Sequence, residues 1–400
     1  MEPPSVPLPP ADPEQARRAL LPAGLRDGLP PHADRQAAAT SFLMAAFGRH
    51  GYERVDPPLV EFEESLLGSD TGGIGQQTFR LLDPLSQRMM GLRADMTVQV
   101  ARIATTRLAG TPRPLRLAYA GDVLRMKGSQ LRPERQFVQV GVELIGAPGV
   151  AADVEVMRLA ATSLAGLGVP GLSIDFNAPT LVGAICAEAG VRGRDLLLTR
   201  AALDRKDADA VRRHAGAATD ALLGLLAATG PAEAAELILT SLALPASQQA
   251  VRARLSQAIG ALREAVPEVQ LTVDPVEHRG FEYYSGIGFT LFARGVTGEL
   301  GRGGRYLAGP EGHLEPATGF SLFMDPIMAA LPAAPAPRRL LLPYGTPHAQ
   351  AESLREDGWI TLAALDRTAN PEDEAHRLGC SHVMVADGIV ALPDQKDTTP

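Results

Sequence analysis

The sequence predicts an α+β fold: an antiparallel sheet flanked by helices, a helical insertion and a small C-terminal β/α unit. Apolar residues alternate over residues 115–145 and again over 270–292, whereas residues 150–266 are rich in alanine and leucine. Alternation with a period of two indicates strands, and apolar residues three and four apart indicate helices. The sheet is therefore expected to form from residues 78–145 and 270–325, with 150–266 as a mainly helical insertion.

The elements before residue 110 are marked by apolar spacing, prolines and glycines. Gly51 is expected to end the first helix, and each proline near residue 57 favours an extended conformation in the residue before it. Asp95 or Thr97 is expected to cap the last of these elements. The expected elements are a helix over 33–49, an extended segment over 52–60, a hairpin over 78–93 around Asp83 and a helix over 97–108.

Later elements follow the same logic. Two strands within 115–145 should enclose a polar loop at 126–134, a single strand at 172–176 should interrupt the helical insertion, and strand-like patterns return at 270–292 and 317–325. The prolines and alanines of 331–337 indicate a linker, and alternating strands and helices follow it. The expected domains are a flexible arm over 1–23, a core over 24–330, the linker over 331–337 and a β/α unit over 338–400.

Composition favours a soluble cytoplasmic protein. The net charge is −8, and Cys186 and Cys380 are the only two cysteines, which suits a reduced compartment. No apolar stretch approaches the roughly 20 residues needed to span a bilayer, and the proline-rich amino terminus lacks the pattern of a signal peptide. The chain has no Lys/Arg run of the kind that binds nucleic acid, so neither tRNA nor a membrane is an expected partner.

The stretch from Gln136 to Gly146 predicts a strand with two different faces. One face would present valines and a leucine; the other would present Phe137, Gln139, Gly141, Glu143 and Ile145. Gln139 and Glu143 lie two pleats apart, about 13 Å along the strand. A carboxylate and an amide on an otherwise apolar strand favour the floor of a small polar pocket. A sheet with one solvated face explains the pattern equally well.

A second stretch, Arg279-Gly-Phe-Glu-Tyr-Tyr-Ser-Gly286, has similar character. Of the adjacent Tyr283 and Tyr284, only one can face a site, because neighbouring strand residues point in opposite directions. A guanidinium beside a phenol suits an anionic or zwitterionic ligand. An edge strand with a surface arginine is the alternative.

Five motifs in order resemble the class II histidyl-tRNA synthetase core, over roughly residues 20–328. They are Leu92-Arg-Ala-Asp-Met-Thr97, Gln139-Val-Gly-Val-Glu143, Arg279 to Gly286, Arg302-Gly-Gly-Arg-Tyr306 and Gly319-Phe-Ser-Leu. The resemblance implies a class II synthetase-like sheet and a histidine pocket. The pocket positions it implies are Asp95, Thr97, Gln139, Glu143, Arg279, and Tyr283 or Tyr284, with Asp95 where the synthetases usually have glutamate.

The same resemblance implies a degenerate ATP site. Arg125 retains the arginine of the second class II motif, but Lys127 stands where a glutamate accepts a hydrogen bond from adenine, and lysine can only donate. In the third motif, Phe323 replaces a glycine that makes room for ATP, and Pro326 replaces the arginine that clamps the γ-phosphate. Adenylation needs cations on the phosphates, so the resemblance implies no catalytic residues, metal or cofactor.

This combination resembles the regulatory subunits that accompany the short form of ATP phosphoribosyltransferase. The resemblance implies a non-catalytic, self-associating chain in a hetero-oligomer with the catalytic subunit, required for its activity and for feedback inhibition by L-histidine in the first step of histidine biosynthesis. A divergent histidyl-tRNA synthetase and a stand-alone histidine sensor are the alternatives.

Overall fold

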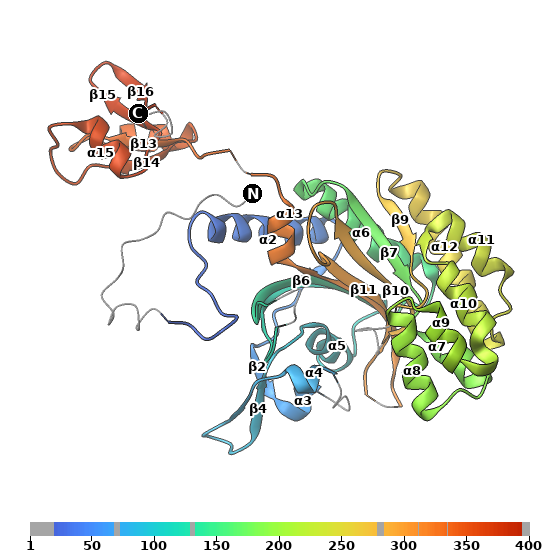
Figure 1. The fold of residues 1–400 in the computed structure, drawn as a ribbon. Helices are drawn as coiled ribbons and strands as arrows, with labels where there is room; N and C mark the ends of the chain where they lie inside the picture. The colour runs from blue at the N-terminus through green and yellow to red at the C-terminus, as the bar shows by residue number, and fades with distance from the viewer. Residues whose placement is uncertain are drawn as a thin grey trace. The chain divides into compact units, whose positions relative to one another are not determined.

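The computed structural model describes residues 20–67, 73–128, 133–277, 284–310, 312–333 and 335–393. The chain divides into two compact units, with the boundary between Pro332 and Ala333 (Figure 1). The expected arm over 1–23 lies outside the described residues up to residue 19. No helix among the residues described is long and apolar enough to cross a membrane.

The first unit is built on a nine-stranded sheet in the order β1-β5-β6-β12-β11-β10-β7-β9-β8. The six strands from β5 to β7 in this order are antiparallel to their neighbours, which confirms the predicted antiparallel core. Parallel pairs, β1 with β5 and β7 with β9, lie toward its margins. The strands are β1 (Glu53–Arg54), β5 (Leu115–Leu124), β6 (Gln136–Ile145), β7 (Leu172–Asn177), β8 (Gly230–Pro231), β9 (Gln270–Val273), β10 (Tyr284–Ala293), β11 (Gly301–Ala308) and β12 (Glu315–Phe323).

Two parts of the expected sheet are placed differently by the structure. The hairpin over 78–93 forms as β3 (Arg80–Leu82) and β4 (Met89–Leu92), but it pairs with β2 (Val60–Phe62) in a separate three-stranded sheet. The carboxylate of Asp83 accepts from Leu85 N and Ser86 N and stabilises its turn. The stretch 150–266 is mainly helical, as predicted, yet its strand β7 joins the main sheet, because Ile174 and Phe176 bury one face while the backbone pairs with β10.

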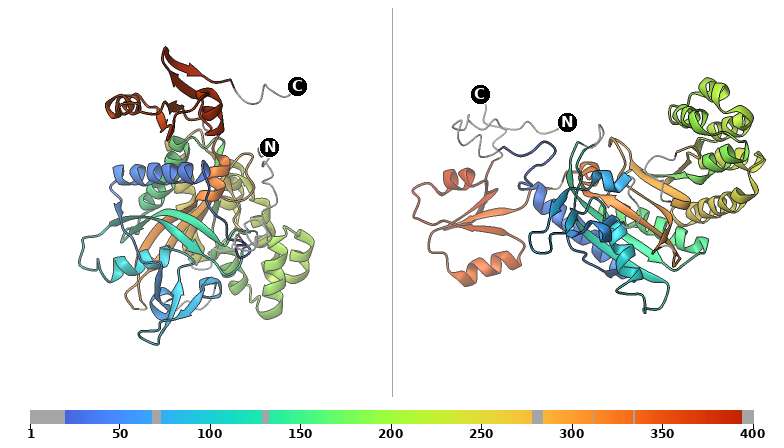
Figure 2. Two further views of the ribbon diagram at one scale, coloured as in Figure 1. Left: turned by 90° about the vertical axis from the view of Figure 1, so that its left-hand side faces the viewer. Right: turned by 90° about the horizontal axis from the view of Figure 1, so that it is seen from below.

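Both faces of the main sheet are covered (Figures 1 and 2). Helices α2 (His32–Arg49), α6 (Val150–Leu167) and α13 (Met324–Ala330) lie on one face, where Val140 and Val142 of β6 enter the larger core. Helix α5 (Thr97–Thr105) lies on the opposite face with a second core, and α3 (Glu63–Leu67) packs beside it against the small sheet, with α4 (Gly73–Gln77) nearby (Figure 1). A sheet with one solvated face is therefore wrong for this chain.

A buried ion-pair cluster connects α6 to the sheet. Asp153 is fully buried and accepts from Arg305 Nε at 2.9 Å and from Arg254 Nη1 at 2.6 Å. Arg305 comes from β11 and Arg254 from α12 (Gln249–Ala265), so one carboxylate joins three elements. Burial lowers the pKa of Arg305, which Asp153 opposes.

The remaining helices of the first unit lie at the end of the sheet that holds β7, β9 and β8 (Figure 1). They are α7 (Thr180–Glu188), α8 (Gly193–Asp204), α9 (Ala208–His214), α10 (Thr219–Ala227) and α11 (Ala232–Ser241). In the second unit a sheet in the order β14-β13-β15-β16 confirms the alternating pattern, and β16 is an addition that the pattern did not predict. Its elements are β13 (Arg339–Leu342), α14 (His348–Glu356), β14 (Ile360–Ala363), α15 (Pro371–Arg377), β15 (His382–Val385) and β16 (Gly388–Ala391).

Candidate functional site

A row of glycines beside Glu143 shapes the face of the sheet that α5 covers. Glu143 of β6 pairs with Gly319 of β12, Gly319 with Gly304 of β11, and Gly304 with Gly288 of β10. Directly paired residues point to the same face of a sheet, so the three glycines leave a trough next to the carboxylate, which the Tyr284 ring enters above Gly304. A Cβ at Gly319 would lie 1.9 Å from Glu143 Oε2. Glycine is therefore required there for Glu143 to fold over β12.

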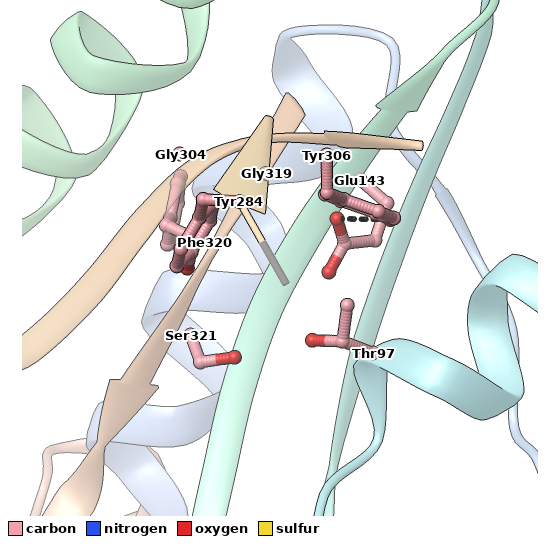
Figure 3. Close-up of a pocket in the computed structure, with 8 residues that line it drawn as sticks. All are labelled: Thr97, Glu143, Tyr284, Gly304, Tyr306, Gly319, Phe320 and Ser321. Atoms are coloured by element: carbon pink, nitrogen blue, oxygen red, sulfur yellow. Dashed lines mark hydrogen bonds between the residues drawn. The ribbon is translucent and has the colours of Figure 1, made fainter. Parts of the chain in front are cut away.

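The Glu143 carboxyl is almost fully buried, with 1% of its surface exposed. Tyr306 donates to its Oε2 at 2.8 Å (Figure 3). Tyr119 donates to its Oε1 at 3.1 Å. Burial raises the pKa of Glu143 to about 8, because desolvation outweighs the hydrogen bonds from Tyr306, Thr97 and Tyr119. The group is therefore poised to lose a proton when a cationic partner arrives.

A second set of polar groups surrounds the start of α5. Gln139 Oε1 accepts from Met96 N at 2.9 Å, and its Nε2 donates to Ser321 Oγ at 2.6 Å and to Asp95 Oδ2 at 3.2 Å. Asp95 Oδ1 also accepts from Thr97 N at 2.8 Å, so Asp95 supplies the side-chain contact at the helix start, whereas Met96 occupies the N-cap position. These bonds fix the amide orientation of Gln139 and couple β6, β12 and α5.

Between these groups lies a small hollow (Figure 3). Its room for water-sized molecules is about 10 Å³, enough for about one water, so the side chains that line it must shift before a molecule of amino-acid size can enter. It is lined by Thr97, Glu143, Tyr284, Gly304, Tyr306, Gly319, Phe320 and Ser321. Within the described part of the chain, no group of three His, Cys, Asp or Glu side chains is arranged to hold a metal ion.

The structure brings five of the seven expected pocket positions together. Thr97, Glu143 and Tyr284 line the hollow, and Asp95 and Gln139 are bonded to each other beside it. Arg279 and Tyr283 lie outside the described residues.

The site also contains three side chains that the sequence analysis did not assign to it: Tyr119, Tyr306 and Ser321. Tyr119 Oη lies 3.0 Å from Ser321 Oγ and 3.2 Å from Thr97 Oγ1. Burial raises the pKa of Tyr119 and of Tyr306. Tyr306 ends the Arg302-Gly-Gly-Arg-Tyr306 motif and Ser321 lies in the Gly319 motif, so both could have been predicted from those motifs. Tyr119 was visible only as a polar-tipped residue in an apolar strand.

The positions expected to form a degenerate ATP site cluster partly around two aromatic rings. Phe323 is buried and packs edge-to-face on Phe137, with ring centroids 5.6 Å apart. The guanidinium of Arg125 lies over the Phe137 ring, and its Nε donates to Ala94 O at 3.3 Å. Lys127 is exposed in the β5–β6 loop, and Pro326 is half-buried in the first turn of α13.

Comparisons with known proteins agree on one family. The family model for histidyl-tRNA synthetase matches residues 24–327. An ATP phosphoribosyltransferase regulatory subunit from Rhodospirillum centenum is 53% identical over 384 residues, covering 96% of this chain and 99% of that protein. A structure described as an ATP phosphoribosyltransferase regulatory subunit/histidyl-tRNA synthetase, from Bacillus halodurans, has a TM-score of 0.75 at 24% identity, covering 90% of this chain and 96% of that one. A chain of the ATP phosphoribosyl transferase (HisG:HisZ) complex from Thermotoga maritima has a TM-score of 0.57 at 18% identity, covering 72% of this chain and 97% of that one. The last two likenesses, below 25% identity, show the fold alone.

Proposed function

Because this chain belongs to the ATP phosphoribosyltransferase regulatory subunits, a family with the histidyl-tRNA synthetase fold, we propose that it activates a catalytic subunit and relays its inhibition by L-histidine. The partner is the short-form catalytic subunit, which joins ATP and phosphoribosyl pyrophosphate in the first step of histidine biosynthesis. The chain works in the cytoplasm as a hetero-oligomer and self-associates through the synthetase-like core.

The observation that carries this proposal is the contrast between the hollow around Glu143 and the positions that follow it at the end of β12 and the start of α13. Around the hollow, the polar side chains are joined by hydrogen bonds: Tyr306 to Glu143, Gln139 to Ser321 and Tyr119 to Ser321. The positions where the synthetases bind ATP hold the buried Phe323 ring and Pro326. A pocket kept without the means to activate its ligand suits a sensor better than a ligase.

L-histidine is the proposed ligand of the hollow. Asp95 and Glu143 take its ammonium or imidazole nitrogens, and Arg279 takes its carboxylate, each by a charge-assisted hydrogen bond. The role of Arg279 rests on the resemblance of its motif. Thr97 and Gln139 orient the carboxylates, and either Tyr283 or Tyr284 closes one side.

A pull-down from native cytoplasm tests the assignment of partners. The tagged full chain should capture an ATP phosphoribosyltransferase catalytic subunit and no tRNA above a bead control. Capture of tRNA would favour a divergent synthetase. Capture of neither would favour a stand-alone histidine sensor.

The isolated chain should show no pyrophosphate exchange above background with ATP and L-histidine. The Phe323 ring takes up space that ATP needs, and Pro326 provides no cation for the γ-phosphate. Exchange of labelled pyrophosphate into ATP measures this, with an active histidyl-tRNA synthetase as the positive control. A rate comparable with that control would contradict the proposed loss of adenylation.

A further inference from the structure

The glycine row beside Glu143 ends at a buried asparagine on the fourth strand from β6. Gly288 of β10 pairs with Asn177, the last residue of β7. Since Glu143, Gly319, Gly304, Gly288 and Asn177 are paired in sequence across five strands, all five point to the same face. The trough that starts at a carboxyl group therefore ends at an amide.

Asn177 is buried, with 1% of its surface exposed. Among the described residues, neither its Oδ1 nor its Nδ2 has a hydrogen-bond partner. A buried amide without partners is costly, and native proteins keep few of them. A Cβ at Gly288 would lie 2.3 Å from Asn177 Oδ1, so Gly288 makes room for this amide as Gly319 makes room for Glu143.

The spacing of the two ends matches a small ligand. Glu143 lies over Gly319 on β12 and Asn177 lies over Gly288 on β10, and two strand spacings separate these strands by about 9.6 Å. This is the scale of an amino acid, but the direct line between the two groups is not open, and Asn177 lies next to the hollow without lining it. The Tyr284 ring lies over Gly304 between the two ends, so a ligand that reaches both packs against this ring.

We propose that the Asn177 amide is the second polar end of the ligand trough and hydrogen-bonds the same ligand as Glu143. The ligand class is a small zwitterionic amino acid with a polar ring, and L-histidine fits it; this inference rests on the proposed function. An amide both donates and accepts, so it matches a neutral imidazole, which has one nitrogen of each kind. Binding would give a partner to an amide that has none among the described residues.

Asn177→Leu and Thr318→Val form a matched pair of variants. Leucine has nearly the shape of asparagine without its polar atoms. Thr318 is also fully buried, and its hydroxyl has no partner in the part of the chain that the structure describes. It is the neighbour of Gly319 in β12 and therefore points to the opposite face. Each variant removes an unpartnered buried polar group and should raise the Tm, by roughly 2–4 °C. Only Asn177→Leu should also weaken L-histidine binding, by about five- to 150-fold.

Calorimetric titration of L-histidine into the full chain, alone and bound to its catalytic subunit, separates the outcomes. Weaker binding by Asn177→Leu with unchanged binding by Thr318→Val supports the proposal. Equal affinity of wild type and Asn177→Leu overturns it, while histidine sensing in this hollow stands as long as Glu143→Gln weakens binding. If the wild type binds no histidine in either state, or Glu143→Gln has no effect, the histidine site itself is elsewhere and both proposals fail.

Discussion

Replacing Glu143 with glutamine should weaken L-histidine binding by about five- to 150-fold and at the same time stabilise the free chain above pH 7. Glutamine keeps the shape and can still bond Tyr119 and Tyr306, but it cannot take a negative charge. Inhibition of the assembled enzyme by histidine should weaken by the same factor. Activation of the catalytic subunit, which depends on the outer surface, should change much less.

The stability gain follows from the raised pKa of Glu143. The folded chain holds this proton up to a pH of about 8, whereas the unfolded chain releases it near 4.5. Between these values the folded state binds more protons, so the free energy of unfolding falls as the pH rises. Glu143→Gln removes that fall and should stabilise the chain by about 4–5 kcal/mol at pH 8.5, and by only about 1 kcal/mol at pH 5.

Calorimetry provides the matching test of ligand binding. Below pH 8, a cationic group that pairs with Glu143 should displace its proton, so histidine binding should release up to one proton at pH 7 and strengthen as the pH approaches 8. Glu143→Gln should abolish this proton release. Glu315→Gln is the control, because Glu315 pairs with Arg113 outside the hollow and its pKa is lowered by that partner. Intact inhibition with lost activation in Glu143→Gln would make Glu143 a structural residue.

Asp153→Ala should destabilise the first unit by about 3–5 kcal/mol. The change leaves the buried Arg305 guanidinium without its carboxylate and breaks the contact of Arg254 with the same group. Removing one partner of a buried pair costs far more than the pair contributes, because the remaining charge stays desolvated. Asp209→Ala, which removes an exposed pair with Arg212, should cost no more than about 0.5 kcal/mol.

Denaturant unfolding followed by circular dichroism measures both variants. Trp359 is the only tryptophan and lies in the second unit, so its fluorescence reports that unit separately. The fluorescence transition should not move when Asp153 is replaced. A loss below 1 kcal/mol for Asp153→Ala would show that the ion-pair cluster does not join α6 to the sheet as described.

Much of the site could be predicted because it lies on single strands. The alternation in β6 placed Gln139 and Glu143 on one face, and the structure shows both buried there. What could not be predicted depends on register between distant strands: Tyr119 and Ser321 meet although 202 residues separate them. Asn177 pairs with Gly288 only because β7 joins the main sheet. The pairing of the 78–93 hairpin with the short strand β2, in a separate sheet, could not be predicted either, because a local pattern does not say which strand a strand pairs with.

The most direct test of the central claim is the rate at which a short-form catalytic subunit joins ATP and phosphoribosyl pyrophosphate, measured with and without this chain and with increasing L-histidine. The account predicts low activity alone, strong activation on adding the chain, and inhibition by histidine that Glu143→Gln weakens. An unchanged rate on adding the full chain, with the catalytic subunit shown to be folded, would contradict its role as a regulatory subunit.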